Sequence, residues 1–342
     1  MKSKDTVLAE GDLIMIGSCS IFDVKGVVHP PGKAIAFPRF ILDSSGDRTH
    51  ENHKYKKVYS ISARFKFLKE NLPQYLVHDP VFDETLCEVP TSDIKTHYKP
   101  VEKSKELCGS EKLDALETKA LRLAELVKEK ADISWNAVGV SGSILVGLHT
   151  ADSDVDPVVY GSENCRKVHY VLQDFLWEQK GSFGSYNRED LKSLFEFRSK
   201  DTAGDFRSFV RTESRKVMQG KFMGTEYFFR FVKDWNEIEE NYGDIQYQNV
   251  GVVRVEATVA DDSEAIFTPC AYEIDNTRIL QGPEVGNIEE IVSFRGRFCE
   301  QARIGEKIVA EGKVERVIDK RQSREHYRLL LGNRPSDFMV LV

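Results

Sequence analysis

The sequence lacks the features that would place it in a membrane or cross-link it covalently. No run of about eighteen apolar residues occurs in its 342 residues, and the opening MKSKDTVLAEGD has no apolar segment of the kind found in secretory signals. Its six cysteines include no CxxC pair, so neither a zinc site nor a disulfide framework is indicated. We therefore expect a cytoplasmic protein with no membrane partner.

Internal repeats, low-complexity tracts and long linkers are also missing. Hydrophobic residues make up 41% of the chain and charged residues 30%, which is typical of a globular protein. The length exceeds what one ordinary core needs, so it predicts two or three domains.

Charges of opposite sign are segregated along the chain, although the net charge is only −7. Residues 188–233 carry eleven Lys or Arg against seven Asp or Glu, and residues 295–334 carry eleven against six. Residues 234–290, between them, hold fourteen acids and two bases. Two basic segments around an acidic one could frame a phosphate-binding cleft at a metal site. Ordinary solvated charge is the alternative for each segment.

The order of patterns along the chain predicts an α+β protein. We expect a β-rich region over residues 1–105, with a polar loop from Leu42 through His53. The core, residues 106–260, is expected to begin with a helix over 105–130 that Ser110 caps. A strand is expected over 221–233. Short strands separated by glycine and charged turns predict a small β-barrel over 261–342, for which an OB-like form is one alternative.

The most informative stretch is 138–161, VGVSGSILVGLHTADSDVDPVVYG. A short apolar strand leads into Gly142 and Ser143, ten residues intervene, and Asp154 and Asp156 then introduce the apolar run PVVY. Because side chains alternate along a strand, the aspartates, with Asp152 before them, are expected on one face. Like charges held together usually surround a cation.

An apolar strand, Gly-Ser, a short helix and Asp-x-Asp at this spacing resemble the signature of the DNA polymerase beta-like nucleotidyltransferase superfamily. The whole chain is also similar to archaeal proteins described as predicted nucleotidyltransferases. The resemblance implies a polymerase beta-like core between the two β-rich regions. It further implies a metal-dependent enzyme that moves a nucleotidyl group from a nucleoside triphosphate such as ATP to an acceptor, which could be RNA, a protein side chain or a small molecule.

The resemblance also implies roles for particular residues. Asp154 and Asp156 are expected to hold magnesium, with two ions in the working site. Gly142 would let the backbone approach the triphosphate, and Ser143 would bind its β and γ oxygens. Asp152 is expected to lie outside the set of metal ligands.

A third carboxylate from a later strand is usual in the superfamily. Glu256, within the alternating strand GVVRVEATV, is the preferred candidate for this catalytic and metal-binding position, and Glu226 is its rival. An outward-facing strand residue is the alternative for both.

Basic residues that could meet phosphates recur every four positions at Arg207, Arg211 and Arg215, as one stripe on a predicted helix. A solvated or salt-bridged helix face is the alternative. If this stripe and the terminal barrel carried the function, the chain would be a nucleic-acid-binding protein with a non-catalytic nucleotide site.

Overall fold

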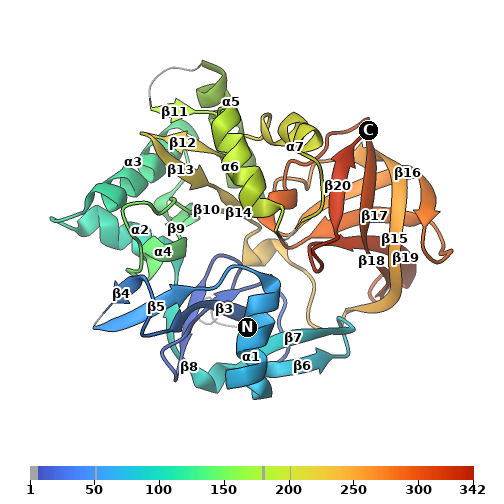
Figure 1. The fold of residues 1–342 in the computed structure, drawn as a ribbon, viewed down its shortest axis with the longest axis horizontal. Coiled ribbons are helices and arrows are strands. Elements are labelled where there is room, and N and C mark those ends of the chain that lie inside the picture. The colour runs from blue at the N-terminus through green and yellow to red at the C-terminus, as the bar shows by residue number, and fades with distance from the viewer. Residues whose placement is uncertain (1–6, 51, 179–181, 201) are drawn as a thin grey trace. The chain divides into compact units, whose positions relative to one another are not determined.

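The structure, a computed structural model, describes residues 7–50, 52–178, 182–200 and 202–342. It is a mixed α+β fold with several sheets (Figure 1), as the sequence predicts. Its two compact units interleave along the chain. The N-terminal unit comprises Met1–Leu76, Cys87–Ser185 and Val217–Glu239, and the C-terminal unit comprises Val77–Leu86, Tyr186–Lys216 and Glu240–Val342. The predicted regions 1–105, 106–260 and 261–342 therefore do not coincide with the compact units.

A large sheet lies mainly in the first part of the N-terminal unit, although its residues within 77–86 belong to the C-terminal unit. Its strands run in the order β4-β5-β3-β2-β1-β8, and β7 pairs with β3 and with β6. The strands are β1 (Leu13–Ile16), β2 (Ile21–Val24), β3 (Lys33–Leu42), β4 (Arg48–His50), β5 (His53–Lys57), β6 (Leu76–Asp79), β7 (Glu84–Pro90) and β8 (Ile94–Tyr98). The predicted polar loop is thus wrong in its second half, because β4 and β5 form an antiparallel pair there.

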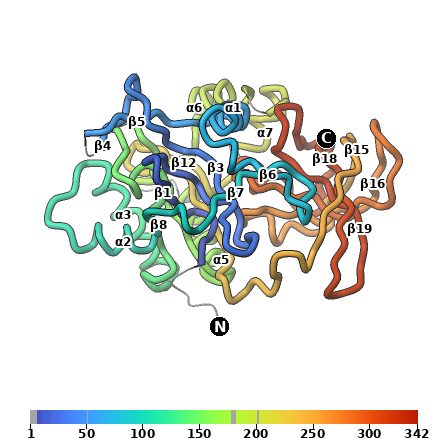
Figure 2. The backbone as a smooth tube through the Cα atoms, turned by 90° about the horizontal axis from the view of Figure 1, so that it is seen from below, coloured from blue at the N-terminus to red at the C-terminus, as the bar shows by residue number. Residues whose placement is uncertain are grey.

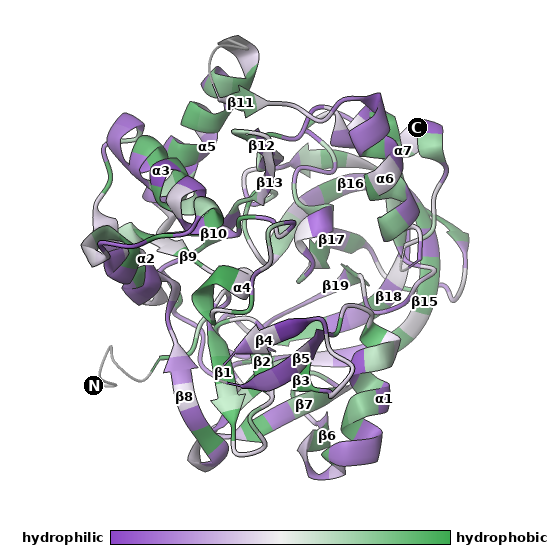
Figure 3. Ribbon diagram, turned by 60° about the vertical axis from the view of Figure 1, so that its left-hand side comes forward, coloured by the Kyte–Doolittle hydropathy of each residue, from purple (hydrophilic) through white to green (hydrophobic). Residues whose placement is uncertain are grey.

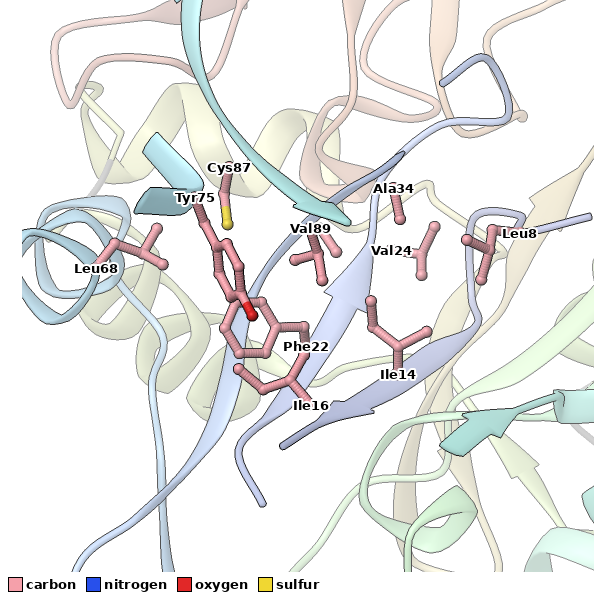
Figure 4. Packing of buried hydrophobic residues seen from close by; sticks show 11 residues of the cluster. Leu8, Ile14, Ile16, Phe22, Val24, Ala34, Leu68, Tyr75, Cys87 and Val89 are labelled. Atoms are coloured by element: carbon pink, nitrogen blue, oxygen red, sulfur yellow. The ribbon is translucent and has the colours of Figure 1, made fainter. Parts of the chain in front are cut away.

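One helix covers the core of this sheet. Ser60 accepts a hydrogen bond from the Ala63 amide and so caps α1 (Ile61–Asn71), which ends just before Pro73. Leu68 from α1 packs with Phe22 and other fully buried side chains of the sheet (Figure 4). Burial of this apolar surface is what holds α1 on the sheet.

A small mixed sheet forms the second part of the unit, in the order β14-β10-β9. β10 (Pro157–Tyr160) lies antiparallel to β9 (Val138–Val140) and parallel to β14 (Arg230–Val232). The helices next to it in sequence are α2 (Pro100–Gly109), α3 (Ala115–Lys130), α4 (Gly142–Leu145) and α5 (Ser162–Glu178).

The single helix predicted over 105–130 is two helices. Ser110 ends α2, and Asp114 caps α3 by accepting from the amides of Leu116 and Glu117. The apolar stripe is as predicted, with Leu116, Leu123 and Val127 buried. The break was missed because Asp114 with Glu117 forms a capping box within the predicted helix.

The strand predicted over 221–233 is interrupted as well. Met223 and Gly224, both at positive φ, turn the chain between β12 (Gln219–Phe222) and β13 (Thr225–Phe228). The short strand β11 (Phe183–Gly184) pairs with β12. After β13 the chain continues into β14, so residues 225–232 pass from one sheet to the next.

Strand pairing in the C-terminal unit returns to its starting strand. β15 (Ile245–Asp261) pairs with both β16 (Cys270–Gln281) and β18 (Lys307–Asp319), and β17 (Ile288–Ser293) pairs in parallel with β19 (Arg324–Leu331). The order β15-β16-β17-β19-β18 therefore closes on β15, with β20 (Phe338–Leu341) added to β18. These strands are the orange and red traces in Figure 2. A barrel-like sheet was predicted, but it begins at β15 rather than after residue 260.

The C-terminal unit also contains α6 (Arg188–Arg198) and α7 (Phe206–Glu213). Within the part of the chain that the structure describes, no helix is both long enough and apolar enough to cross a membrane.

Candidate functional site

The turn between β9 and α4 is held to the start of β10 by the backbone. The Ser141 amide donates to the Asp156 carbonyl over 2.8 Å, and its hydroxyl donates to the Gly11 carbonyl over 2.6 Å. Ser141 is buried, so both bonds are shielded from water. The Gly-Ser turn and the aspartates therefore meet although ten residues separate Ser143 from Asp154.

Gly142 is required here for two physical reasons. Its φ is +66°, a conformation that L side chains rarely adopt. A Cβ at this position would lie 1.9 Å from Asp156 Oδ2. The carboxylate thus packs directly against the glycine backbone.

Asp154 and Asp156 lie close enough to interact electrostatically. Desolvation of the Asp156 carboxyl, followed by the negative charge of Asp154, raises the pKa of Asp156 to about 6, and nearby cations offset part of the rise. Asp154 is more open, with 42% of its side chain exposed. Asp152 is exposed. The motif therefore presents one desolvated and one accessible carboxylate.

The Ser143 hydroxyl is buried, and its oxygen has no hydrogen-bond partner within the described residues. A buried hydroxyl without a partner costs about 1–3 kcal/mol. Such unpaired polar atoms occur where a ligand supplies the missing partner or where strain is stored at a functional site.

Two cations approach the aspartates from the N-terminal sheet. Lys57 Nζ, at the end of β5, lies 3.9 Å from Asp154 Oδ1. Arg39 of β3 and Lys57 both lower the pKa of Asp156, partly offsetting desolvation and Asp154. Their charged groups lie over one ring, that of Tyr59, at 5.3 Å for Arg39 Cζ and 4.9 Å for Lys57 Nζ.

Behind these residues lies a buried ion-pair network. Arg230 of β14 donates to Glu10 over 2.6 Å, and Lys25 contacts both Glu10 and Asp23 at 2.9 Å. Burial opposes ionisation of Asp23, but Lys25, Arg230 and Arg64 outweigh it and hold the pKa of that carboxyl well below its ordinary value. Arg230 also contributes to the field at Asp156.

The β4–β5 hairpin is tied to the loop that carries the aspartates. Arg48 is 8% exposed, and its Nη1 donates to the Leu148 carbonyl over 2.5 Å and lies 3.4 Å from the Ser153 hydroxyl. His50 lies beside Gly147, where an added Cβ would be 3.1 Å from its Nδ1. Figures 1 and 3 show β4 and β5 next to α4.

Strand register distinguishes the two candidates for a third carboxylate. Val155 bridges Tyr227 in parallel, and β10 continues with the same offset against β14. Glu226 therefore occupies the register position beside Asp154. Glu256 instead belongs to β15 of the C-terminal unit, where its carboxylate pairs with Arg278 at 3.2 Å. The structure does not bring Glu256 together with Asp154 and Asp156 within one unit.

The predicted arginine stripe is also in the C-terminal unit, and it is mostly engaged with protein groups. Arg215 lies beyond the end of α7 and makes a bidentate contact with Glu306 at 2.5 and 2.6 Å. Arg211 donates to the carbonyl of Val342 over 3.1 Å, whereas Arg207 is exposed. Arg215 is therefore salt-bridged, as the alternative to a phosphate-binding stripe predicts.

Sequence patterns did not reveal the site residues from the N-terminal β-rich region, which are Arg39, Arg48, Lys57 and Tyr59. A signal was present in HKYKK at 53–57, where Tyr55 is buried between exposed lysines. That alternation predicts a strand, but nothing in the sequence shows which distant loop the strand contacts.

The donor set fits magnesium in part. Among the residues that the structure describes, no group of three or more His, Cys, Asp or Glu side chains converges as a metal site. Magnesium, however, is often held by one or two carboxylates together with water and substrate phosphates. Asp154 and Asp156 supply such a pair, so they would hold a magnesium ion only together with water or other ligands from outside the chain.

Comparisons with known proteins give a relative that matches most of the chain. No protein-family model matches the sequence, and no solved structure matches it. The chain is 31% identical over 319 residues, 91% of each protein, to the uncharacterized protein MJ1086 of Methanocaldococcus jannaschii. This chain therefore belongs to the same protein family as MJ1086.

Proposed function

We propose that the protein is a magnesium-dependent nucleotidyltransferase. The observation that carries the proposal is the contact between Gly142 and Asp156, which joins the two halves of the Gly-Ser and Asp-x-Asp motif. The order of elements around it, α3-β9-α4-β10-α5-β14 with a mixed sheet, supports a polymerase beta-like core.

The reaction is displacement at the α-phosphorus of a nucleoside triphosphate. An acceptor hydroxyl forms a new oxygen–phosphorus bond, the bond to the α–β bridging oxygen breaks, and pyrophosphate leaves. The hydroxyl proton passes to a base, for which Glu226 is the carboxylate placed beside Asp154 by strand register. Alignment and charge stabilisation are the main contributions a protein makes to this transfer.

Each motif residue has a role in this scheme. Asp154 and Asp156 would hold magnesium, which when bound offsets charge on the phosphates and favours ionisation of the attacking hydroxyl. Gly142 has no side chain that would displace the Asp156 carboxylate. The Ser143 hydroxyl, which has no partner among the described residues, would donate to a phosphate oxygen.

The proposal is tested by incubating the protein and magnesium with each α-labelled nucleoside triphosphate and with acceptor pools of RNA, protein and small molecules. The Asp154→Asn, Asp156→Asn double variant is expected to remove label transfer without unfolding the chain. Transfer that persists undiminished in this variant would contradict the proposal.

Nucleic-acid binding by the C-terminal unit is the second candidate. Its closed strand order, with the third and fifth strands parallel, is that of OB barrels, which bind single strands. Ion pairing reduces the charge available for this role, because arginines of the barrel contact acids; these are Arg254, Arg278, Arg316, Arg324 and Arg328. Salt-sensitive RNA binding that survives the Asp154→Asn, Asp156→Asn change would favour this candidate.

A further inference from the structure

We infer that Lys57 and Arg39 of the N-terminal sheet form the triphosphate-binding side of the site, with Tyr59 as the platform that holds both cations in place. This inference rests on the proposed function and extends it to residues outside the Gly-Ser and Asp-x-Asp motif. It assigns a substrate-binding role to the sheet that precedes the core in the chain.

The Lys57 side chain is largely shielded from solvent and lies near Asp154. Its side chain is only 7% exposed, yet no hydrogen bond is found for its ammonium among the described residues. The contact with Asp154, at 3.9 Å, is too long for a hydrogen bond. The three donors of the ammonium are therefore not occupied by hydrogen bonds within the described residues, and they are available to a further acceptor.

Arg39, on the neighbouring strand β3, also has side-chain donors that make no hydrogen bond within the described residues. The Val58 amide donates to the Arg39 carbonyl over 2.8 Å, which places Arg39 beside the end of β5. In the described part of the chain, its guanidinium has a ring contact with Tyr59 but no hydrogen bond. Five N–H donors are therefore left for oxygens, and a guanidinium matches phosphate in a bidentate manner.

The charged groups of Lys57 and Arg39 lie over the same aromatic ring and act on the same carboxylate. Both stand over the ring of Tyr59, which is 45% exposed, and both act electrostatically on Asp156. Two aspartates lie on one side, and on the other lie two cations whose donors make no hydrogen bonds within the described residues. This arrangement suits a ligand that carries several negative charges together with a divalent cation. A magnesium triphosphate has that composition.

The β4–β5 hairpin is joined to the aspartate loop by a buried hydrogen bond. Arg48 of β4 is bonded to the Leu148 carbonyl, so β5 and the aspartate loop are held in one arrangement. Figure 3 colours β4 and β5 as strongly hydrophilic although they lie beside the apolar α4. Rigid placement of charged donors is what binding of phosphate oxygens needs.

The test is calorimetric titration of the whole chain with magnesium tripolyphosphate and with each magnesium–nucleoside triphosphate. Lys57→Met keeps the apolar stem and removes the charge, and Arg39→Met does the same on β3. Lys56→Met is the matched control, since Lys56 adjoins Lys57 on the opposite, exposed face of β5. Each test variant is expected to weaken binding by about 10-fold to 100-fold, and the control by less than about 2-fold.

Other outcomes overturn the inference in distinguishable ways. If wild-type protein binds these ligands and Lys57→Met binds them equally well, the inference fails while the proposed function stands. If folded wild-type protein binds neither tripolyphosphate nor any nucleoside triphosphate, both fail. Circular dichroism of each variant establishes that it is folded before titration.

Discussion

The carboxylate of Asp156 occupies the space in which a side chain at Gly142 would lie, with Oδ2 1.9 Å from the position of the missing Cβ. Gly142→Ala is therefore expected to displace Asp156 and to lower the rate of transfer by more than about 100-fold. The positive φ adds about 1–2 kcal/mol of strain.

Gly32→Ala separates these two effects. Gly32 has a φ of +73°, but nothing lies within 4 Å of its added Cβ. Gly32→Ala should lower the free energy of unfolding through backbone strain, but its rate of transfer should equal that of the wild type. Equal activity of the two variants would show that the contact between Gly142 and Asp156 is irrelevant to the reaction.

Arg48 is expected to act as a positioning residue. Arg48→Ala leaves the Leu148 carbonyl without its buried donor, so the free energy of unfolding should fall by about 1–3 kcal/mol. Amide exchange at Thr150 and Ser153, which bond to each other across the loop, should accelerate more than exchange in β3. Uniform acceleration across the unit would indicate a general loss of stability instead.

Two matched substitutions test which glutamate is the third carboxylate of the site. Glu226→Gln is expected to lower the transfer rate by about 100-fold or more, because its register position is beside Asp154. Glu256→Gln should stay within about 2-fold of wild type, since Glu256 pairs with Arg278 on an exposed part of β15. The reverse result would identify Glu256, the candidate preferred from the sequence, as the catalytic carboxylate.

Arg215 is expected to matter for stability rather than for phosphate binding. Arg215→Ala breaks the bidentate contact with Glu306 and should lower the urea midpoint, at a cost of about 1–2 kcal/mol. Arg207→Ala, at an exposed site, should change stability by less than about 0.5 kcal/mol. Weaker binding of magnesium tripolyphosphate by either variant would contradict this assignment.

Asp23 gives a pH dependence of known sign. Burial opposes its ionisation, but Lys25, Arg230 and Arg64 lower its pKa in the folded state below the ordinary value of 3.8. Its contribution to stability is therefore present above about pH 4 and is lost as the pH falls further. The free energy of unfolding, measured with urea between pH 7 and pH 3, should fall less with decreasing pH in Asp23→Asn than in the wild type. An equal fall in both proteins would show that Asp23 does not cause this pH dependence.

The sequence predicted the local parts of the fold well. The apolar stripe of α3 and the presence of strands in the terminal sheet follow from periodicity, which local residues alone determine. The strands were expected to be short, but β15, β16 and β18 have 17, 12 and 13 residues. The turn at Gly224 was missed because it lies inside a longer apolar pattern. The break before Asp114 was missed because the predicted helix was continued through the capping box that Asp114 forms with Glu117. The closure of β15 on β18 depends on pairing between distant strands, which no local pattern specifies.

The candidate site likewise combines residues from one continuous stretch of sequence with residues that only tertiary contacts bring near it. Gly142, Ser143, Asp154 and Asp156 belong to one continuous stretch, and the structure brings Gly142 and Asp156 into contact. Lys57 and Arg39 could not be assigned, because their relevance comes from a tertiary contact about a hundred residues away in sequence. The preference for Glu256 over Glu226 rested on alternation alone, whereas the register with β10 comes from sheet pairing.

The most direct test of nucleotidyl transfer is ³¹P nuclear magnetic resonance of each nucleoside triphosphate with stoichiometric protein, magnesium and an acceptor pool. We predict cleavage of the α–β bond with pyrophosphate as the released product, and no such cleavage by the Asp154→Asn, Asp156→Asn variant. Release of orthophosphate alone, or no consumption of any of the four nucleotides by folded protein with every acceptor pool, would contradict it.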